Sequence, residues 1–344
     1  MNNAVVHPVG DTQTLVGRIT QRPPLRLIVL MPLRDDWLSA TELIRRLDQT
    51  ISSDACTMEI IVVDDGSLQR CDRSAFQVSF SAVRGIRILR LRRNLGHQRA
   101  IAIGLVYVQQ TVICDAVVVM DSDGEDTPEG VAQLLSAYSK LDGANLIFAE
   151  RSRRSESLKF RGFYHLYRLL HKCLTGVRVR VGNFSILPFS YLNTLVVVNE
   201  LWNHYAAAVF RTNLPYTMVP IPRGARIAGV SRMNFVALVS HGLSAVSVFG
   251  DVVGVRILIA SLTGSLLTGL GMVVVVSIRL FTDRAIPGWA TYAIGTLAII
   301  MIQLITIATS FTFFMLSNRT NLGFLPLRDY SFFVEEAVEI YSHE

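Results

Sequence analysis

Four carboxylates follow a short apolar run in the middle of the sequence. The run AVVVM ends at Met120, and Asp121, Asp123, Glu125 and Asp126 come directly after it. Carboxylates this close repel one another unless a cation lies among them, and a hard divalent ion prefers oxygen ligands. Alternation along an extended chain turns the side chains of Asp121 and Asp123 to the same side. The pair therefore predicts a site for Mg²⁺ or Mn²⁺ together with substrate phosphates.

A simple polar loop is the alternative interpretation of this stretch. Asp126 precedes Thr-Pro-Glu, a pattern typical of a residue that caps the start of a helix. For Asp121 and Asp123 the metal is favoured, because a second acidic pair, Asp64 and Asp65, follows another apolar run.

The elements that must position these acids alternate along the first half of the chain. Continuous apolar runs separated by segments of helical spacing predict a mostly parallel sheet with both faces covered. Ligands bind such sheets outside the carboxyl ends of the strands, and the acidic pairs, which include Asp35 and Asp36, lie at these ends. The expected strands are 25–32, 58–67, 86–91, 115–121 and 144–150, and the expected helices are 35–51, 97–110 and 128–139.

Two long apolar runs near the C-terminal end predict a membrane hairpin. Residues 257–278 and 289–316 contain no charged side chain, and about 20 apolar residues suffice for a helix to cross a bilayer. Two buried helices of a large soluble core are the alternative, although uncharged runs this long are rare there. Two spans leave both flanks on one side, and the arginines before the first span place that side in the cytoplasm.

The basic character of the chain comes almost entirely from arginine. The 344 residues carry a formal net charge of +6 and a mean hydropathy of +0.39. Arginine suits phosphate groups, so anionic ligands or an anionic membrane surface are expected. Nucleic-acid binding would explain the charge but not the acidic cluster or the apolar runs. The four cysteines are widely separated, which is typical of a reducing compartment and gives no sign of a zinc site or a disulfide framework.

Several motifs together resemble glycosyltransferase family 2, and within it the polyisoprenyl-phosphate glycosyltransferases. They are VVDDGS (62–67), RRNLGHQRAIAIGL (92–105) and MDSDGEDTPE (120–129), followed by the two apolar runs. The resemblance implies a GT-A type Rossmann-like mostly parallel sheet, followed by interfacial helices and two transmembrane helices. The expected division is a mobile tail (1–24), a cytoplasmic transferase domain (25–230), an amphipathic interfacial region (231–252), a transmembrane hairpin (253–318) and a cytoplasmic C-terminal tail (319–344).

The resemblance also implies roles for individual residues. Asp121 and Asp123 are expected to bind the metal and, with Arg151 and Arg154, to act in catalysis. Residues expected to bind the nucleotide-sugar are Pro32, Asp36, Asp64, Asp65, Asn94, His97, Asp121 and Ser122. Residues expected to bind the acceptor phosphate are Arg151, Arg154, Arg161, Arg226, Ser231 and Arg232. For Arg161 and the neighbouring Lys159, a solvated face or contact with lipid headgroups is an equal alternative.

The implied reaction moves a sugar from a UDP- or GDP-linked donor to polyprenyl (undecaprenyl) phosphate, with inversion at the anomeric carbon. Glucose from UDP-glucose is the first expectation, and mannose, N-acetylglucosamine and aminoarabinose-type sugars are alternatives. The enzyme is expected in the cytoplasmic (inner) membrane as a multi-pass protein, and a homo-tetramer is expected by analogy alone. A non-catalytic membrane scaffold on a degenerate transferase fold is the alternative from another class. A processive synthase would need a Gln-x-x-Arg-Trp motif, which the sequence lacks.

Four positions depart from the pattern of the family. Asp36 stands where a glutamate is expected, Gly124 and Glu125 replace Leu and Gln, and Asn183 replaces an aspartate. Asparagine cannot act as a general base. A phosphate acceptor has its second pKa near about 6, so the nucleophile arrives ionised and the missing base is tolerable.

Overall fold

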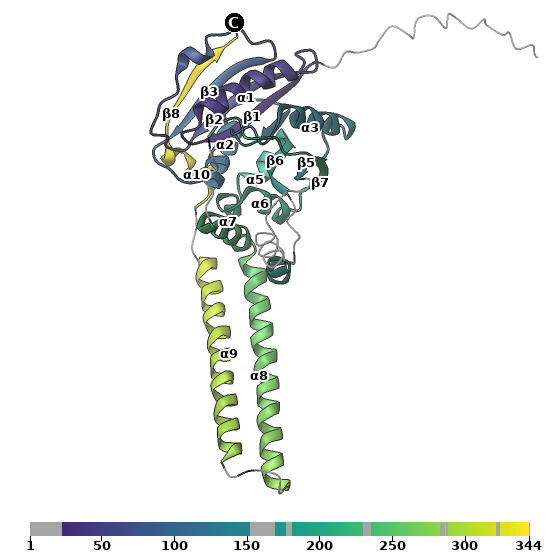
Figure 1. Cartoon of the computed structure of the whole chain (residues 1–344), viewed down its shortest axis with the longest axis vertical. Helices are drawn as coiled ribbons and strands as arrows, with labels where there is room; N and C mark the ends of the chain where they lie inside the picture. Colours follow the sequence, from purple (N-terminus) through teal and green to yellow (C-terminus); the bar gives the residue numbers. More distant parts are fainter. Residues whose placement is uncertain are drawn as a thin grey trace, which may run out of the picture.

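The core of the protein is a mixed sheet in which strands β1 to β4 run parallel (Figure 1). The computed structural model describes residues 23–151, 169–176, 181–229, 235–282, 286, 288–320 and 324–343. Over these residues the strand order is β7-β5-β6-β4-β1-β2-β3-β8. The strands are β1 (Leu25–Leu33), β2 (Cys56–Asp64), β3 (Val83–Leu91), β4 (Ala116–Val119), β5 (Leu146–Arg151), β6 (Val181–Pro188), β7 (Tyr216–Ile221) and β8 (Val334–Ser342).

Only some of the pairings outside this parallel group are antiparallel. Strand β6 pairs antiparallel with both β4 and β5, and β8 pairs antiparallel with β3. Strand β7 pairs parallel with β5 at the other edge. The expected mostly parallel sheet is therefore correct for its centre, and the sheet as a whole is mixed.

Both faces of the sheet are buried, as the continuous apolar runs predict. Within β1, Leu27, Val29 and Met31 belong to one core cluster, and the alternate residues Ile28 and Leu30 belong to the other. This alternation follows from the twofold period of a strand. The first cluster packs against α1 (Trp37–Thr50) and α3 (Pro128–Lys140), and the second packs against α2 (His97–Thr111), α5 (Phe189–Leu195) and α6 (Tyr205–Arg211). The 3-10 turns η1 (Arg73–Phe76) and η2 (Asn199–Trp202) lie in the connections between these elements.

Two long helices project from one end of the sheet domain, below helix α7 (Phe235–Ser247) (Figure 1). They are α8 (Gly250–Phe281) and α9 (Trp289–Thr320), and both are long and apolar enough to cross a membrane. Only 6% of the most apolar window of each helix is buried, whereas a helix in a soluble core would have its apolar side chains covered. The structure thus differs from the alternative of two buried core helices.

Close packing between α8 and α9 depends on small residues. A Cβ atom at Gly254 would lie 2.3 Å from Sδ of Met315, and one at Gly264 would lie 2.9 Å from Cδ1 of Leu304. Glycine at these positions therefore lets the two helices approach, as is common between membrane helices.

The segment expected to be a C-terminal tail, 319–344, is partly built into the sheet. After α10 (Pro326–Asp329) and η3 (Tyr330–Phe333), strand β8 pairs with β3 along its whole length. Oppositely charged side chains face each other across this edge, since Arg90 lies 3.5 Å from Glu336 and Arg87 lies 3.7 Å from Glu339. Such cross-strand pairs add to the ladder, and they explain why a glutamate-rich segment forms a strand here.

Candidate active site

The acidic pairs lie together at the carboxyl ends of three neighbouring strands. In the parallel register, Leu33 of β1 lies opposite Asp64 of β2, and Leu30 lies opposite Val119 of β4. The residues that follow each strand therefore reach the same edge of the sheet, as the sequence predicts. Pro32 is buried within β1, and Ser122 is 7% exposed beside the acidic pair.

Asp64 and Asp65 are buried and hydrogen-bonded within the protein. Asp64 is fully buried and accepts from the backbone N–H of Ser67 at 2.8 Å and from Nε of Arg90 at 3.3 Å. Asp65 accepts from the backbone N–H groups of Leu95 at 2.6 Å and Gly96 at 2.8 Å. Burial raises the pKa of Asp65, and these two N–H groups act in the opposite direction.

These contacts give both carboxylates a structural role that the sequence did not reveal. Asp65 holds the loop before α2, the loop in which exposed Asn94 accepts from the N–H of Gly96 at 3.0 Å. Contact of Asp64, Asp65 and Asn94 with the nucleotide stays a prediction.

The acidic loop, residues 121–126, is folded back on itself. Asp126 accepts from the backbone N–H of Asp121 at 2.9 Å, and Asp123 accepts from the N–H of Glu125 at 3.0 Å. Gly124 has φ +85°, a left-handed conformation that favours glycine. The helix cap is Thr127, which accepts from Gly130 N–H at 3.1 Å. The expectation that Asp126 caps α3 is therefore wrong, because its carboxylate is buried against the loop instead.

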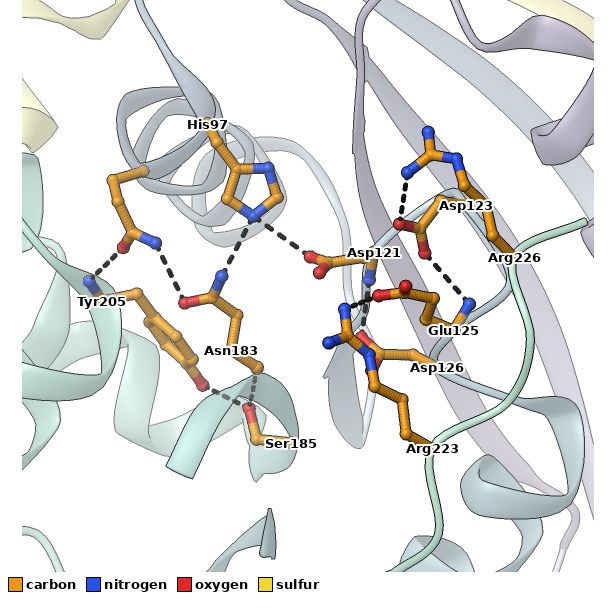
Figure 2. A network of polar contacts seen from close by, with 11 residues as sticks. His97, Asp121, Asp123, Glu125, Asp126, Asn183, Ser185, Tyr205, Arg223 and Arg226 are labelled. Carbon is orange, nitrogen blue, oxygen red and sulfur yellow. Dashed lines mark hydrogen bonds and ion pairs between the residues drawn. The ribbon is translucent and has the colours of Figure 1, made fainter. Parts of the chain in front are cut away.

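A chain of hydrogen bonds runs from α6 to the acidic loop (Figure 2). Tyr205 N–H donates to Oε1 of Gln98 at 2.7 Å, and Nε2 of Gln98 donates to Oδ1 of Asn183 at 3.1 Å. Nδ2 of Asn183 then lies 3.0 Å from Nε2 of His97. A backbone N–H can only donate, so the first bond fixes the direction of the whole chain and leaves an N–H of Asn183 pointing at His97.

His97 has a second partner at the same nitrogen. Its Nε2 lies 3.1 Å from Oδ1 of Asp121, and its side chain is 42% exposed. Burial lowers the pKa of His97, but the carboxylates of Asp121, Asp126 and Asp65 outweigh this effect and raise the pKa. The protonated ring pairs with Asp121, whereas the neutral ring accepts from Asn183.

The hydrogen-bond chain contains residues that the sequence did not single out. Gln98 and Tyr205 are both buried, and they lie 107 positions apart. Ser185 joins them through a 2.8 Å hydrogen bond to the hydroxyl of Tyr205. The position of Gln98 beside His97 at the start of α2 was the one feature of the sequence that could have indicated this hydrogen-bond chain.

Arg226 lies beside the acidic loop (Figure 2). Its Nη1 donates to Oδ2 of Asp123 at 3.0 Å, and its Nη2 donates to Oδ2 of Asp36. Nearby, Arg223 pairs with Glu125. A carboxylate attracts a guanidinium by the same charge-assisted hydrogen bonds as a phosphate does. The expected binding of the acceptor phosphate by Arg226 stays a prediction.

Only part of the rest of the expected acceptor site lies among the described residues. Arg151 is the last residue of β5. Arg154, Lys159, Arg161, Ser231 and Arg232 lie outside the described residues. Their binding of the acceptor phosphate stays a prediction.

The oxygen donors of the acidic loop fit a divalent cation that is shared with a substrate. Among the described residues, no three His, Cys, Asp or Glu side chains are grouped so as to hold a metal ion by themselves. Mg²⁺ typically takes one or two carboxylates and completes its shell with substrate phosphates and water. Asp121 and Asp123 supply such a partial set, and the guanidinium on Asp123 shows that this position accommodates positive charge.

Comparison with known proteins agrees with this geometry. The chain is 24% identical over 271 residues to the uncharacterized glycosyltransferase YkcC of Bacillus subtilis (strain 168), which covers 76% of this chain and 80% of that protein. It is 25% identical over 224 residues to the undecaprenyl-phosphate 4-deoxy-4-formamido-L-arabinose transferase of Salmonella choleraesuis (strain SC-B67), which covers 63% of this chain and 65% of that protein.

A solved structure also aligns with the chain. It is glucosyl-3-phosphoglycerate synthase from Mycobacterium tuberculosis in complex with Mn²⁺, UDP-glucose and phosphoglyceric acid, with a TM-score of 0.48 and 15% identity over 67% of this chain and 80% of that one.

The profile of glycosyl transferase family 2 matches residues 29–196. This range contains β2 to β6, all but the first four residues of β1, and every acidic pair at the strand ends. The resemblance read from the motifs is confirmed, and so is the GT-A type Rossmann-like fold. Residues 29–196 of this chain are a glycosyl transferase family 2 domain.

Proposed function

We propose that the protein transfers a sugar from a nucleoside-diphosphate donor to the phosphate of a polyprenyl lipid, with inversion at the anomeric carbon. The observation that carries the proposal is a carboxylate site at the strand ends of a domain joined to two membrane-length helices. The named activity of the Salmonella relative, which is an undecaprenyl-phosphate transferase, supports the same acceptor class.

The orientation of the sheet supports a lipid acceptor. Strand β8 runs away from α7 toward its end near the C label, and β3 and its parallel neighbours run the opposite way (Figure 1). The carboxyl ends of β1 to β4, and with them the acidic loop, therefore face the side on which α7, α8 and α9 lie. A polyprenyl phosphate in a membrane crossed by α8 and α9 would meet the site from this side.

The described residues divide the work of binding the donor. Asp121 and Asp123 would hold Mg²⁺ or Mn²⁺, which when bound neutralises the charge of the departing nucleoside diphosphate. His97 lies beside Asp121 at the N-terminus of α2, where its ring, when protonated, and the helix N-terminus would favour donor phosphate. Asp36 follows β1 at the same edge. The buried pair Asp64 and Asp65 fixes the loops that surround the nucleotide.

No general base is needed for this reaction. Asn183 stands where the resemblance to the family implies an aspartate, and its amide is occupied by Gln98 and His97. A lipid phosphate is already ionised near neutral pH, so the protein has to position it and exclude competing water. Arg151 and Arg154 remain the proposed clamp on that phosphate.

Two candidate sugars are proposed. Glucose from UDP-glucose is the first candidate. The Salmonella relative favours a second, an arabinose-type sugar, because its name specifies 4-deoxy-4-formamido-L-arabinose. We place the protein in the cytoplasmic membrane with α8 and α9 as its two spans, and the transferase domain in the cytoplasm.

A transfer assay tests the proposal. Purified full-length protein in detergent is incubated with undecaprenyl phosphate, Mn²⁺ or Mg²⁺, and one radiolabelled donor at a time from a panel that includes UDP-glucose, UDP-4-deoxy-4-formamido-L-arabinose and GDP-mannose. We expect label to enter the lipid phase from one donor. The signal should vanish with EDTA and in Asp123→Ala, and it should persist in Asp54→Ala, since Asp54 is an exposed carboxylate remote from the site.

Two outcomes would contradict the proposal. Label transferred equally well by Asp123→Ala would remove the acidic loop from the mechanism. Transfer to water or to a soluble phosphate, with none to the lipid, would remove the polyprenyl acceptor.

A further inference from the structure

The guanidinium of Arg226 is held on all three of its nitrogens. Nη1 and Nη2 donate to Oδ2 of Asp123 and Oδ2 of Asp36, and Nε donates to the carbonyl oxygen of Ala228 at 2.9 Å. The two carboxylates come from the ends of different strands, β4 and β1, and each side chain is less than a quarter exposed. A single positive charge thus joins two carboxylates that would otherwise repel each other.

Arg226 belongs to a stretch, residues 222–229, that lies over the acidic loop and that we call the covering segment. Ile227 N–H donates to the carbonyl oxygen of Asp123, and Gly224 N–H donates to the carbonyl oxygen of Glu125, both at 2.9 Å. The side chain of Arg223 pairs with Glu125. Backbone and side-chain contacts therefore hold the covering segment to the loop that carries Asp121 and Asp123.

The oxygen bound by Arg226 is one that a divalent cation needs. Of the two carboxylate oxygens of Asp123, Oδ1 accepts from Glu125 N–H and Oδ2 accepts from Arg226. A guanidinium and a divalent ion at the same carboxylate repel each other strongly, because the site is partly shielded from water. Binding of the metal and retention of Arg226 on Asp123 are thus in conflict.

We propose that Arg226 takes the place of the divalent cation in the unloaded donor site, and that loading of the metal displaces Arg226 together with the covering segment. This inference rests on the proposed function, since it assumes that Asp123 binds the metal of a nucleotide-sugar transferase. It adds an order of substrate binding to that function. The donor and metal load first, and the guanidinium they release is then free to bind another anion.

The position of the covering segment makes the acceptor phosphate that anion. Beyond residue 229 the chain leads to α7, which lies between the sheet domain and α8 (Figure 1). A guanidinium that leaves Asp123 therefore stays on the side of the site that faces the membrane helices. The expected role of Arg226 at the acceptor phosphate and its observed contact with Asp123 are two states of one residue.

Manganese binding tests the proposal without any transfer reaction. The affinity of the full-length protein for Mn²⁺ alone is measured from the free-ion electron paramagnetic resonance signal. We expect Arg226→Gln to bind Mn²⁺ about tenfold more tightly or better, the size of effect that a nearby charge has on a carboxyl pKa. Arg226→Lys, which keeps the charge, should stay closer to the wild type. The control Arg45→Gln removes an arginine of α1 that donates to the carbonyl oxygen of Ala75 at 3.0 Å, and it should change nothing.

A second measurement uses only the wild-type protein. Trypsin cleavage after Arg223 and Arg226, identified by mass spectrometry, should be slow in EDTA and faster with Mn²⁺ and UDP. Faster cleavage together with tighter binding by Arg226→Gln would support displacement of the covering segment.

The contrary results are equally clear. Equal or weaker Mn²⁺ binding by Arg226→Gln, or no measurable binding by either protein, would overturn the proposal, and so would equal protection from trypsin in both conditions. Failure of sugar transfer with these binding results intact would instead count against the proposed function alone.

Discussion

Gly124 offers a sharp test of how the acidic loop and the covering segment fit together. Its φ of +85° is left-handed, and a Cβ atom there would lie 2.4 Å from Cγ1 and 2.6 Å from Cδ1 of Ile227. Alanine at this position should cost about 1–2 kcal/mol for the left-handed backbone. Moving Ile227 out of the overlap should add about 1–3 kcal/mol.

These two contributions can be separated by matched variants. Gly229 is also left-handed, with φ +73°, but the nearest atom to its added Cβ is Nε of Arg226 at 4.0 Å. Gly229→Ala should therefore show only the backbone contribution, about 1–2 kcal/mol. In an Ile227→Ala background, Gly124→Ala should likewise lose its steric part.

The assay is thermal unfolding of the purified protein in detergent at a fixed scan rate. With about 2–4 °C of midpoint shift per kcal/mol for a domain of this size, Gly124→Ala should melt several degrees below Gly229→Ala. The difference should shrink when Ile227 is replaced. If Gly124→Ala and Gly229→Ala melt together, or if the Ile227→Ala background changes nothing, the packing of the covering segment on the acidic loop is not as described.

Three further predictions follow from contacts elsewhere in the chain. Asp48→Ala should lower the unfolding midpoint, because Oδ1 of Asp48 accepts from the buried N–H groups of Ala82 at 2.7 Å and Val83 at 2.9 Å. Each buried N–H group left without an acceptor costs about 1–3 kcal/mol of folding stability, and an unchanged midpoint would refute this. Gly254→Val should weaken the packing of α8 on α9 and lower the melting temperature of the helical signal by the equivalent of about 1–3 kcal/mol. The control Gly269→Val, where an added Cβ meets nothing within 4 Å, should leave that temperature unchanged. Equal effects of the two variants would argue against the close approach at Gly254. Asn183→Asp should leave the turnover number no higher than that of the wild type, because the proposed phosphate acceptor needs no base. A faster enzyme would contradict the proposed base-free displacement.

The elements from β1 to β5 could be predicted because the sequence patterns that indicate them are local. Continuous apolar runs gave β1 to β5 within a few residues of their observed ends, and helical spacing gave α1, α2 and α3. The convergence of Asp36, Asp64 and Asp121 followed from the rule that parallel strands end at one edge. No knowledge of distant contacts was needed for any of these steps.

The rest depends on contacts between residues far apart in the sequence. Arg226 reaches Asp123 across 103 positions and Asp36 across 190. An arginine attracts phosphate and carboxylate alike, so its residue type could not distinguish the two partners. Gln98 and Tyr205 carry no pattern that pairs them, and β8 became recognisable as a strand only through the arginines of β3 that face its glutamates.

The return of the chain to β3 after the two long helices has a consequence for how the protein is made. Arg90 and Glu336, which face each other across β3 and β8, are 246 positions apart, and both α8 and α9 are synthesised between them. During translation the edge of β3 therefore has no partner until both apolar helices have left the ribosome. An unpaired edge recruits other chains and promotes aggregation, and pairing across so long a separation is slow. Completion of the sheet thus waits for the helices, and a chain whose helices fail to enter the membrane would keep β8 from its place and expose β3.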